Sequence, residues 1–126
     1  IGCGQLEVLE DRVQSRRENY NFYVKELQHK FKFLEAPKGY FSNRWLTCML
    51  TESYGEREQI RLALQEQQIE SRPLWKPMHL QPIFKKYPRY VNGVSENLFE
   101  KGLCLPSGSN LSNSDLTSIK DILKEF

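Results

Sequence analysis

The residues best suited to chemistry lie together in one short stretch, residues 70–84, which reads ESRPLWKPMHLQPIF. It contains a tryptophan, a histidine, two cations and three prolines. Each proline lacks a backbone N–H and has a fixed φ, so a central strand is not expected here. We predict an ordered, extended loop that presents its side chains, because loops of this kind often carry function.

The cations and the imidazole of this stretch could bind an anionic ligand. Arg72 offers a planar fork of donors, Lys76 a point charge, and His79 a donor or an acceptor. Trp75 could form a flat wall against a sugar or a base ring. A structural alternative has equal weight: a proline-stiffened loop packed on the core, with Arg72 in an ion pair. The residues alone leave both interpretations open.

Cations and aromatic rings also alternate here and beyond, a pattern typical of surfaces that stack bases and follow a phosphate backbone. The residues concerned are Trp75, Lys76, Phe84, Lys85, Lys86, Tyr87, Arg89 and Tyr90. The net charge of the chain is only +2. We therefore favour the alternative that the rings anchor the loop while the cations stay in solvent, and we expect no nucleic-acid partner.

Metal and hydrolase sites have little support. The possible zinc ligands are Cys3, His29, Cys48, His79 and Cys104. None of them lies at a C-x-x-C or H-x-x-x-H spacing, so buried free thiols are the better interpretation and no metal site is expected. The chain has no G-x-S-x-G motif, and Cys48 lies in an apolar stretch where a thiolate is disfavoured.

Length and composition favour one globular domain. The chain has 126 residues, of which 39% are hydrophobic and 27% are charged, values ordinary for a soluble protein. No apolar run approaches the roughly 20 residues that span a bilayer, so no membrane association is expected. Three cysteines far apart in sequence fit reduced thiols and a cytoplasmic location. Because the chain begins with Ile1 rather than Met, we expect it to be part of a longer protein.

The elements that must position these side chains begin with a long helix, predicted over about residues 5–29. Its apolar stripe consists of Leu6, Leu9, Val13, Tyr20, Val24 and Leu27. These residues recur at spacings of three, four and seven, and no proline interrupts the segment. A helix of this length needs a surface to pack against, because its buried face supplies most of its stability.

Shorter elements of both kinds follow. They are strands over 31–34 and 44–51, a helix over 56–68, an edge strand before Pro73, a helix over 96–101, a strand over 103–105 and a final helix. Ser95 and Gly102 are expected to start and stop the short helix. Ser112 and Asp115 form a weak capping box for the last helix. The predicted class is α/β (α+β), with a small sheet of three to four strands flanked by helices.

Four stretches of the chain resemble segments of one enzyme family. They are IGCGQLEVLEDRVQSRRENYNFYVKEL, SRPLWKPMHLQPIF, SENLFEKGLCLPSGSNLS and SNSDLTSIKDILKEF. The second is similar to a signature near the C-terminus of the DegT/DnrJ/EryC1/StrS pyridoxal-phosphate sugar aminotransferases, closest to the branch of pilin, capsule and bacillosamine-type glycan synthesis. Together the stretches cover essentially the whole chain.

The resemblance implies a fold of the aspartate-aminotransferase type (fold type I), with a large cofactor domain and a smaller C-terminal domain. Residues 1–126 then form the single small domain with its long leading helix, and the domain that binds pyridoxal 5'-phosphate is absent from this chain. The family's Schiff-base lysine lies upstream of the segment IGCGQL. We therefore expect this chain alone to bind no cofactor and to be catalytically inactive.

For the intact parent, the resemblance implies transfer of an amino group from glutamate to the 4-keto carbon of a nucleotide-linked 6-deoxy sugar. It also implies a homodimer. Arg72, Trp75, Lys76 and His79 are the expected substrate-binding wall, with Gln81 added. The two cations would meet carboxylate or diphosphate, the indole an apolar face and His79 the sugar. The alternative is a non-enzymatic module that binds a protein or a single-stranded nucleic acid.

Overall fold

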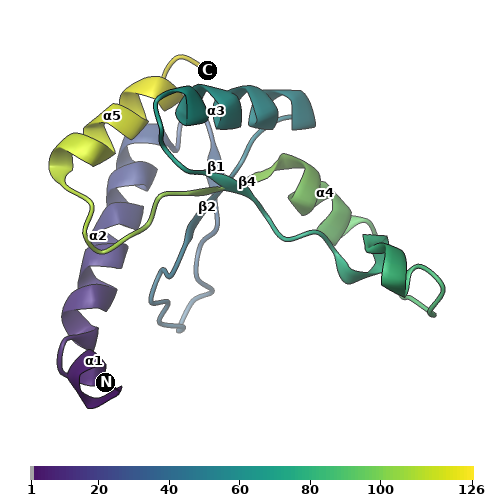
Figure 1. The fold of residues 1–126 in the computed structure, drawn as a ribbon, viewed down its shortest axis with the longest axis horizontal. Helices are drawn as coiled ribbons and strands as arrows, with labels where there is room; N and C mark the ends of the chain where they lie inside the picture. Colours follow the sequence, from purple (N-terminus) through teal and green to yellow (C-terminus); the bar gives the residue numbers. More distant parts are fainter. Residues whose placement is uncertain (1) are drawn as a thin grey trace.

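A four-stranded antiparallel sheet forms the centre of the structure, a computed structural model that describes residues 2–126 (Figure 1). The strands are β1 (Lys32–Phe33), β2 (Thr47–Leu50), β3 (Arg72–Pro73) and β4 (Gly102–Leu105). They lie in the order β1-β2-β4-β3, and all three neighbouring pairs are antiparallel. The predicted mixed class and small sheet are confirmed, although β1 and β2 are shorter than the predicted strands and β4 is one residue longer.

Five α-helices and two 3-10 turns accompany the sheet in the described residues. They are α1 (Gly2–Glu7), α2 (Leu9–Leu27), α3 (Tyr54–Glu66), α4 (Val94–Lys101), α5 (Asn113–Leu123), η1 (Met78–Leu80) and η2 (Pro82–Phe84). Within residues 2–126, no helix combines the length and the apolarity that crossing a bilayer requires. The helix predicted over 56–68 begins two residues earlier because the Ser53 hydroxyl accepts a hydrogen bond from the Glu56 N–H at 3.1 Å.

The predicted long helix is two helices that meet at Val8, whose φ of −113° and ψ of 11° are not helical. α1 buries none of its residues, so no packing holds it in line with α2. Figure 1 shows α1 and the first half of α2 extending away from the sheet. Leu6 and Leu9, predicted on the buried stripe, are 68% and 46% exposed. The apolar stripe is therefore buried only toward the C-terminal end of α2.

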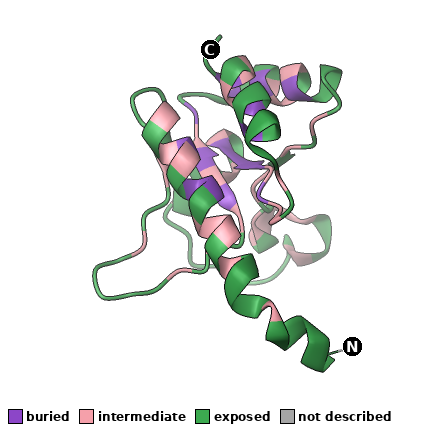
Figure 2. Ribbon diagram, turned by 90° about the vertical axis from the view of Figure 1, so that its left-hand side faces the viewer, coloured by how far each residue is buried: buried purple, intermediate pink, exposed green. Residues whose placement is uncertain are grey.

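One hydrophobic core joins the sheet to α2, α3 and α5. Its fully buried members include Tyr23 and Leu27 of α2, Ile60 and Leu64 of α3, Ile119 and Leu123 of α5, and Met49 and Leu103 of the sheet. Figure 2 shows the same division along α2, with buried residues toward its C-terminal end and exposed ones toward its N-terminus. Each large apolar side chain in this core contributes about 1.5–3 kcal/mol relative to an exposed one.

The hydrogen-bond pattern of β4 explains how a proline fits into the sheet. The Thr51 N–H donates to the Lys101 carbonyl at 3.0 Å, and the Leu74 N–H donates to the Gly102 carbonyl at 3.1 Å. Along β4, alternate residues therefore bond to β2 and to β3. Pro73 pairs with Leu103, whose backbone bonds point to β2, so the missing N–H costs no ladder bond. The predicted edge strand is confirmed and includes its proline.

Two helix boundaries test the capping predictions. The Ser112–Asp115 capping box is complete, because each residue's side chain bonds to the backbone N–H of the other. The prediction for Ser95 is wrong: α4 begins at Val94, and its N-cap is Gly93, in the left-handed region at φ 81°. A turn that requires positive φ favours glycine over serine at this position.

Gly102 ends α4 as predicted, but it does so as the first residue of β4, in an extended conformation. It is needed for space rather than for a left-handed stop. A Cβ at this position would lie 2.1 Å from Leu74 Cδ1 and 2.5 Å from the Leu98 carbonyl oxygen. The glycine thus lets α4 and the chain after β3 approach the centre of the sheet.

Candidate functional site

A groove of about 380 Å³ lies beside β3 and β4. Its walls come from residues 45–46, residues 70–73 with Trp75, and residues 104–107. We call it the tryptophan groove. Side chains alternate between the two faces of a strand, so Cys104, which lines the groove, points away from the core that holds Leu103. Three segments far apart in the sequence thus meet at the face of β4 opposite the core.

Two indole rings dominate the tryptophan groove. Trp45 and Trp75 have ring centroids 6.1 Å apart and planes inclined by 31°. Their side chains remain 61% and 67% exposed, so they present flat apolar surfaces to solvent. Such surfaces are suited to packing on a sugar or a base ring. The sequence patterns missed Trp45 because residues 44–51 were interpreted as one strand, whereas β2 begins at Thr47.

Arg72 is the cation of this groove. Its Nε and Nη2 lie 2.7 and 2.5 Å from Glu70 Oε1, and the two side chains are 77% and 73% exposed. An ion pair this open to water contributes about 0–1 kcal/mol. The structural ion pair and the ligand-binding role are therefore compatible, because an incoming anion would displace Glu70 at little cost.

The other three predicted residues are not among those that line the tryptophan groove. His79 is nearly buried, with 12% of its side chain exposed, and its Nε2 lies 2.7 Å from Glu96 Oε1 of α4. Gln81 Nε2 bonds to the Lys76 backbone carbonyl at 3.4 Å, and the Lys76 side chain is exposed. The structure brings together Arg72 and Trp75, while the 3-10 turn at Met78–Leu80 directs His79 toward α4.

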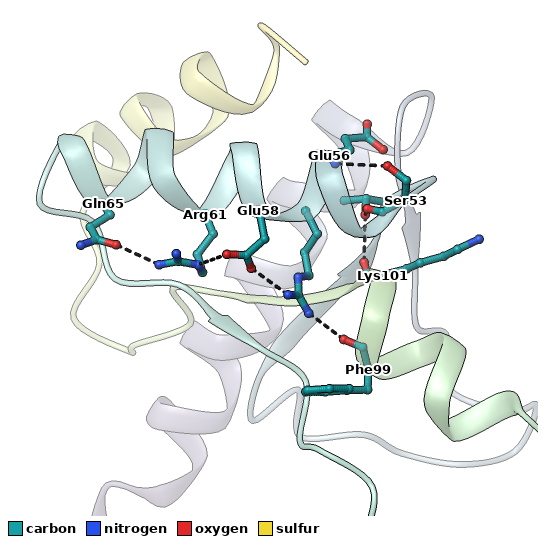
Figure 3. A network of polar contacts seen from close by, with 9 residues as sticks. Ser53, Glu56, Glu58, Arg61, Gln65, Phe99 and Lys101 are labelled. Atoms are coloured by element: carbon teal, nitrogen blue, oxygen red, sulfur yellow. Dashed lines mark hydrogen bonds and ion pairs between the residues drawn. The ribbon is translucent and has the colours of Figure 1, made fainter. Parts of the chain in front are cut away.

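A network of polar contacts between α3 and the end of α4 fixes the helix to which His79 is bonded (Figure 3). Arg57, only 4% exposed, donates to the Phe99 carbonyl at 2.7 Å and pairs with Glu58 at 2.7 Å. Arg61 Nε contacts the same carboxylate at 3.0 Å. Desolvation would raise the pKa of Glu58, but the hydrogen bonds from both arginines outweigh it and hold that pKa below its usual value.

The predicted alternation of cations and rings divides into two groups. Trp75 contacts Trp45, whereas Phe84 and Tyr87 contact each other with ring centroids 6.4 Å apart. Lys86 Nζ lies 5.4 Å from the Tyr87 ring centroid. Tyr90 is fully exposed. Trp75 and Tyr87 are also mostly exposed, at 67% and 55%, so the interpretation that the rings anchor the loop to the core is wrong for Trp75, Tyr87 and Tyr90.

The tryptophan groove lacks one group that pyridoxal 5'-phosphate requires. That cofactor needs a lysine amine for its Schiff base, and no lysine lines the tryptophan groove. These residues therefore do not form a cofactor site by themselves. In residues 2–126, no cluster of three or more His, Cys, Asp or Glu side chains could hold a metal ion. Cys3 is exposed and Cys48 is half-buried, so the expectation of buried thiols is correct only for Cys104.

The chain is similar to known proteins along almost its whole length. The chain matches the model of the DegT/DnrJ/EryC1/StrS aminotransferase family along residues 1–124. It is 38% identical to EpsN of Bacillus subtilis (strain 168), whose name describes a pyridoxal phosphate-dependent aminotransferase, over 98% of this chain and 33% of that protein. It is 32% identical to GDP-perosamine synthase of Escherichia coli O157:H7, over 100% of this chain and 34% of that protein.

A solved structure has the same fold. The crystal structure of a DegT DnrJ EryC1 StrS aminotransferase from Brucella abortus superposes with a TM-score of 0.87 and 29% identity, covering 98% of this chain and 33% of that one. The chain therefore spans about a third of the length of the curated relatives that it matches.

Proposed function

Because this chain belongs to the DegT/DnrJ/EryC1/StrS aminotransferase family, we propose that it is the small C-terminal domain of a pyridoxal-phosphate-dependent sugar aminotransferase. The observation that carries the proposal is the family match along residues 1–124. A domain that spans about a third of its relatives leaves room in the whole protein for a separate cofactor domain. We assign the Schiff-base lysine to that domain, because no lysine lines the tryptophan groove.

The proposed reaction of the whole protein moves an amino group from glutamate to the 4-keto carbon of a nucleotide-linked 6-deoxy sugar. The 4-amino sugar would serve surface polysaccharide, pilin or glycoprotein glycan synthesis. The similarity to a GDP-perosamine synthase supports a nucleotide sugar as the substrate class. Pyridoxal phosphate, when bound, supplies the electron sink that amino transfer needs.

The residues of this chain would form one wall of the substrate cleft. Trp75, stacked near Trp45, offers an apolar surface to a sugar or base ring. Arg72 would exchange its exposed partner Glu70 for a carboxylate or a diphosphate, whose geometry matches the guanidinium fork. Lys76 would add a second positive charge from its exposed position next in the chain.

His79 and Gln81 complete the proposed wall from the 3-10 turns that follow. His79 Nε2 already contacts Glu96, so Nδ1 is the atom through which this residue would reach the sugar. The carboxylate would hold the ring in one orientation. Gln81 bonds to the Lys76 carbonyl, which links its position to the start of the turn.

The proposal is tested with the full-length protein that contains this sequence. The assay measures the 4-amino sugar and 2-oxoglutarate formed from glutamate and a nucleotide-linked 4-keto-6-deoxy sugar. Arg72→Ala and His79→Ala should each lower kcat/KM at least tenfold, about 1.4 kcal/mol of transition-state stabilisation. Arg89→Ala, at an exposed arginine that does not line the groove, is the matched control and should leave the kinetics unchanged. Full activity of both Arg72→Ala and His79→Ala would reject the assigned roles.

The isolated chain provides a second test. Mixed with pyridoxal phosphate, it should show no Schiff-base absorbance beyond the background of surface lysines, and no amino transfer. A saturable band at a single lysine would contradict the assignment of the cofactor to the rest of the protein. Absence of aminotransferase activity in the full-length protein with every 4-keto nucleotide sugar tested would reject the proposed reaction.

A further inference from the structure

Two cysteines that are distant in sequence face each other across the centre of the sheet. Cys48 of β2 and Cys104 of β4 are direct partners in the strand register. Their Sγ atoms lie 3.8 Å apart, although 56 positions separate the residues along the chain. Cys48 is half-buried and Cys104 is 7% exposed. The two thiols thus form a dithiol at the sheet face opposite the main core.

The position of this pair within the ladder suits a cross-strand disulfide. Thr51 and Lys101 are hydrogen-bonded partners, and bonded and non-bonded pairs alternate along antiparallel strands. Cys48 and Cys104 therefore occupy a non-hydrogen-bonded pair, in which Cα atoms approach to about 4.5 Å. This separation is within the range of about 4.4–6.8 Å that disulfides span. Rotation of the two side chains, without movement of the strands, is enough to join the sulfur atoms.

The two thiols differ in exposure and in the direction in which their pKa values are shifted. The hydrogen bond with Cys104 lowers the pKa of the Cys48 thiol, and burial opposes this effect only in part. The same contact, with burial, raises the pKa of Cys104. The thiolate is the nucleophile in thiol–disulfide exchange. Cys48, which is also the more exposed of the two, is therefore the attacking residue, and Cys104 the resolving one.

We propose that Cys48 and Cys104 are a reversible redox modification site, which a low-molecular-weight disulfide such as glutathione disulfide oxidises to a cross-strand disulfide. The Cys48 thiolate attacks one sulfur of the reagent, and the other half leaves as a thiolate. The Cys104 thiol then loses its proton and attacks the Cys48 sulfur, which releases the second half. Two electrons pass from the cysteines to the reagent, and the two protons are taken up by the released thiolates.

This site is independent of the proposed aminotransferase function, because it rests only on the register of β2 and β4. It is nevertheless adjacent to the tryptophan groove, which Cys104 lines together with Arg72 and Trp75. Oxidation would tie β4, the strand that carries one wall of the groove, to β2. The bond would close a long loop and so restrict the unfolded chain much more than the folded one.

Equilibration in glutathione buffers of defined ratio tests the proposal on the 126-residue chain. Samples are quenched in acid, alkylated and analysed by peptide mass spectrometry, with and without denaturing urea. The equilibrium constant for the Cys48–Cys104 disulfide should be at least about 100-fold larger without urea than in urea. Cys3, exposed on α1, is the internal control and should exchange with glutathione equally in both conditions. Equal constants for the cysteine pair in both conditions would overturn the proposal.

Two variants test the order of attack. Cys104→Ser should accumulate a mixed disulfide with glutathione at Cys48, whereas Cys48→Ser should react at Cys104 at least about tenfold more slowly. Equal rates would refute the assigned roles. If either serine fails to fold, the initial rate of mixed-disulfide formation at each cysteine of the unmodified chain supplies the same comparison. Faster formation at Cys104 than at Cys48 would again refute the assignment.

Discussion

Replacing Gly102 by alanine probes the contact on which the junction of α4, β3 and β4 depends. The added Cβ would lie 2.1 Å from Leu74 Cδ1, 2.5 Å from Leu74 Cγ and 2.5 Å from the Leu98 carbonyl oxygen. A leucine side chain can rotate away from such a contact. The carbonyl belongs to the backbone of α4, so relief of that contact requires the last turn of the helix to move.

The magnitude follows from these distances. Overpacking that forces such shifts costs about 1–3 kcal/mol. For a chain of this length, each kcal/mol lowers Tm by about 4 °C. We therefore expect Gly102→Ala to lower Tm by about 4–12 °C, measured by circular dichroism, and to lower the urea midpoint without changing the m-value.

A matched glycine and a double variant sharpen the test. Gly55 lies near the start of α3, and a Cβ there would meet only Ser53 Oγ, at an ordinary 3.8 Å. Gly55→Ala should therefore be neutral or stabilising by up to about 1 kcal/mol. Adding Leu74→Ala to Gly102→Ala removes the side-chain clash but leaves the carbonyl, so only part of the loss should be recovered in a double-mutant cycle. A Gly102→Ala chain as stable as the parent would refute the close approach described here.

Three further substitutions, at Tyr23, Ser112 and Glu58, should change the stability of the chain. Tyr23→Phe removes the buried hydroxyl that donates to the Pro106 carbonyl at 3.0 Å. The free energy of unfolding, measured in urea, should fall by about 1–3 kcal/mol. Tyr40→Phe, at a ring that is 76% exposed, is the control and should leave it unchanged. Equal effects of the two would contradict the role of that bond. Ser112→Ala breaks the capping box of α5 and should cost about 1 kcal/mol, and an unchanged unfolding midpoint would argue against the cap. Because the pKa of Glu58 is held below its usual value of 4.5, its contribution to stability is present above about pH 4.5 and is lost as the pH falls through the lower folded-state pKa. Glu58→Gln should therefore weaken the loss of stability between pH 7 and pH 3, and an identical pH profile would contradict the paired carboxylate.

Patterns within a few residues of sequence correctly predicted those elements whose formation depends mainly on neighbouring residues. The helix predicted over 56–68 is present as α3 (Tyr54–Glu66), and the spacing of Ser112 and Asp115 correctly indicated a helix start. The break at Val8 could not be predicted in this way. The apolar period continues across Val8, so the pattern gives no sign that the helix is interrupted there.

The site was predicted only where it is continuous in sequence. Arg72 and Trp75 were identified from their residue types, and both line the tryptophan groove. Trp45 was missed because its contact with Trp75 joins two segments that meet only through the strand order. His79 turns toward Glu96 because the chain forms a 3-10 turn after Pro77, a change of direction that residue types do not encode.

Cys48 and Cys104 are neighbours only because of the register in which β2 and β4 pair. β2 and β4 are neighbours in the sheet, yet α3, β3 and α4 lie between them in the chain. A shift of one residue in the pairing would move Cys104 to the core face and separate the thiols. No count or spacing of cysteines could therefore indicate that Cys48 and Cys104 are partners.

The prolines of residues 70–84 occupy positions where a backbone donor is not needed. Pro73 lies at a non-hydrogen-bonded position of an edge strand, Pro77 precedes η1 with φ −55°, and Pro82 is the first residue of η2. Trp75 lies between two of these fixed φ angles, so the backbone limits its position although 67% of the side chain is exposed. Its ring partner Trp45 precedes β2, whereas Trp75 follows β3. Both strands pair with β4, and the indole pair therefore forms only when β4 is in place between them.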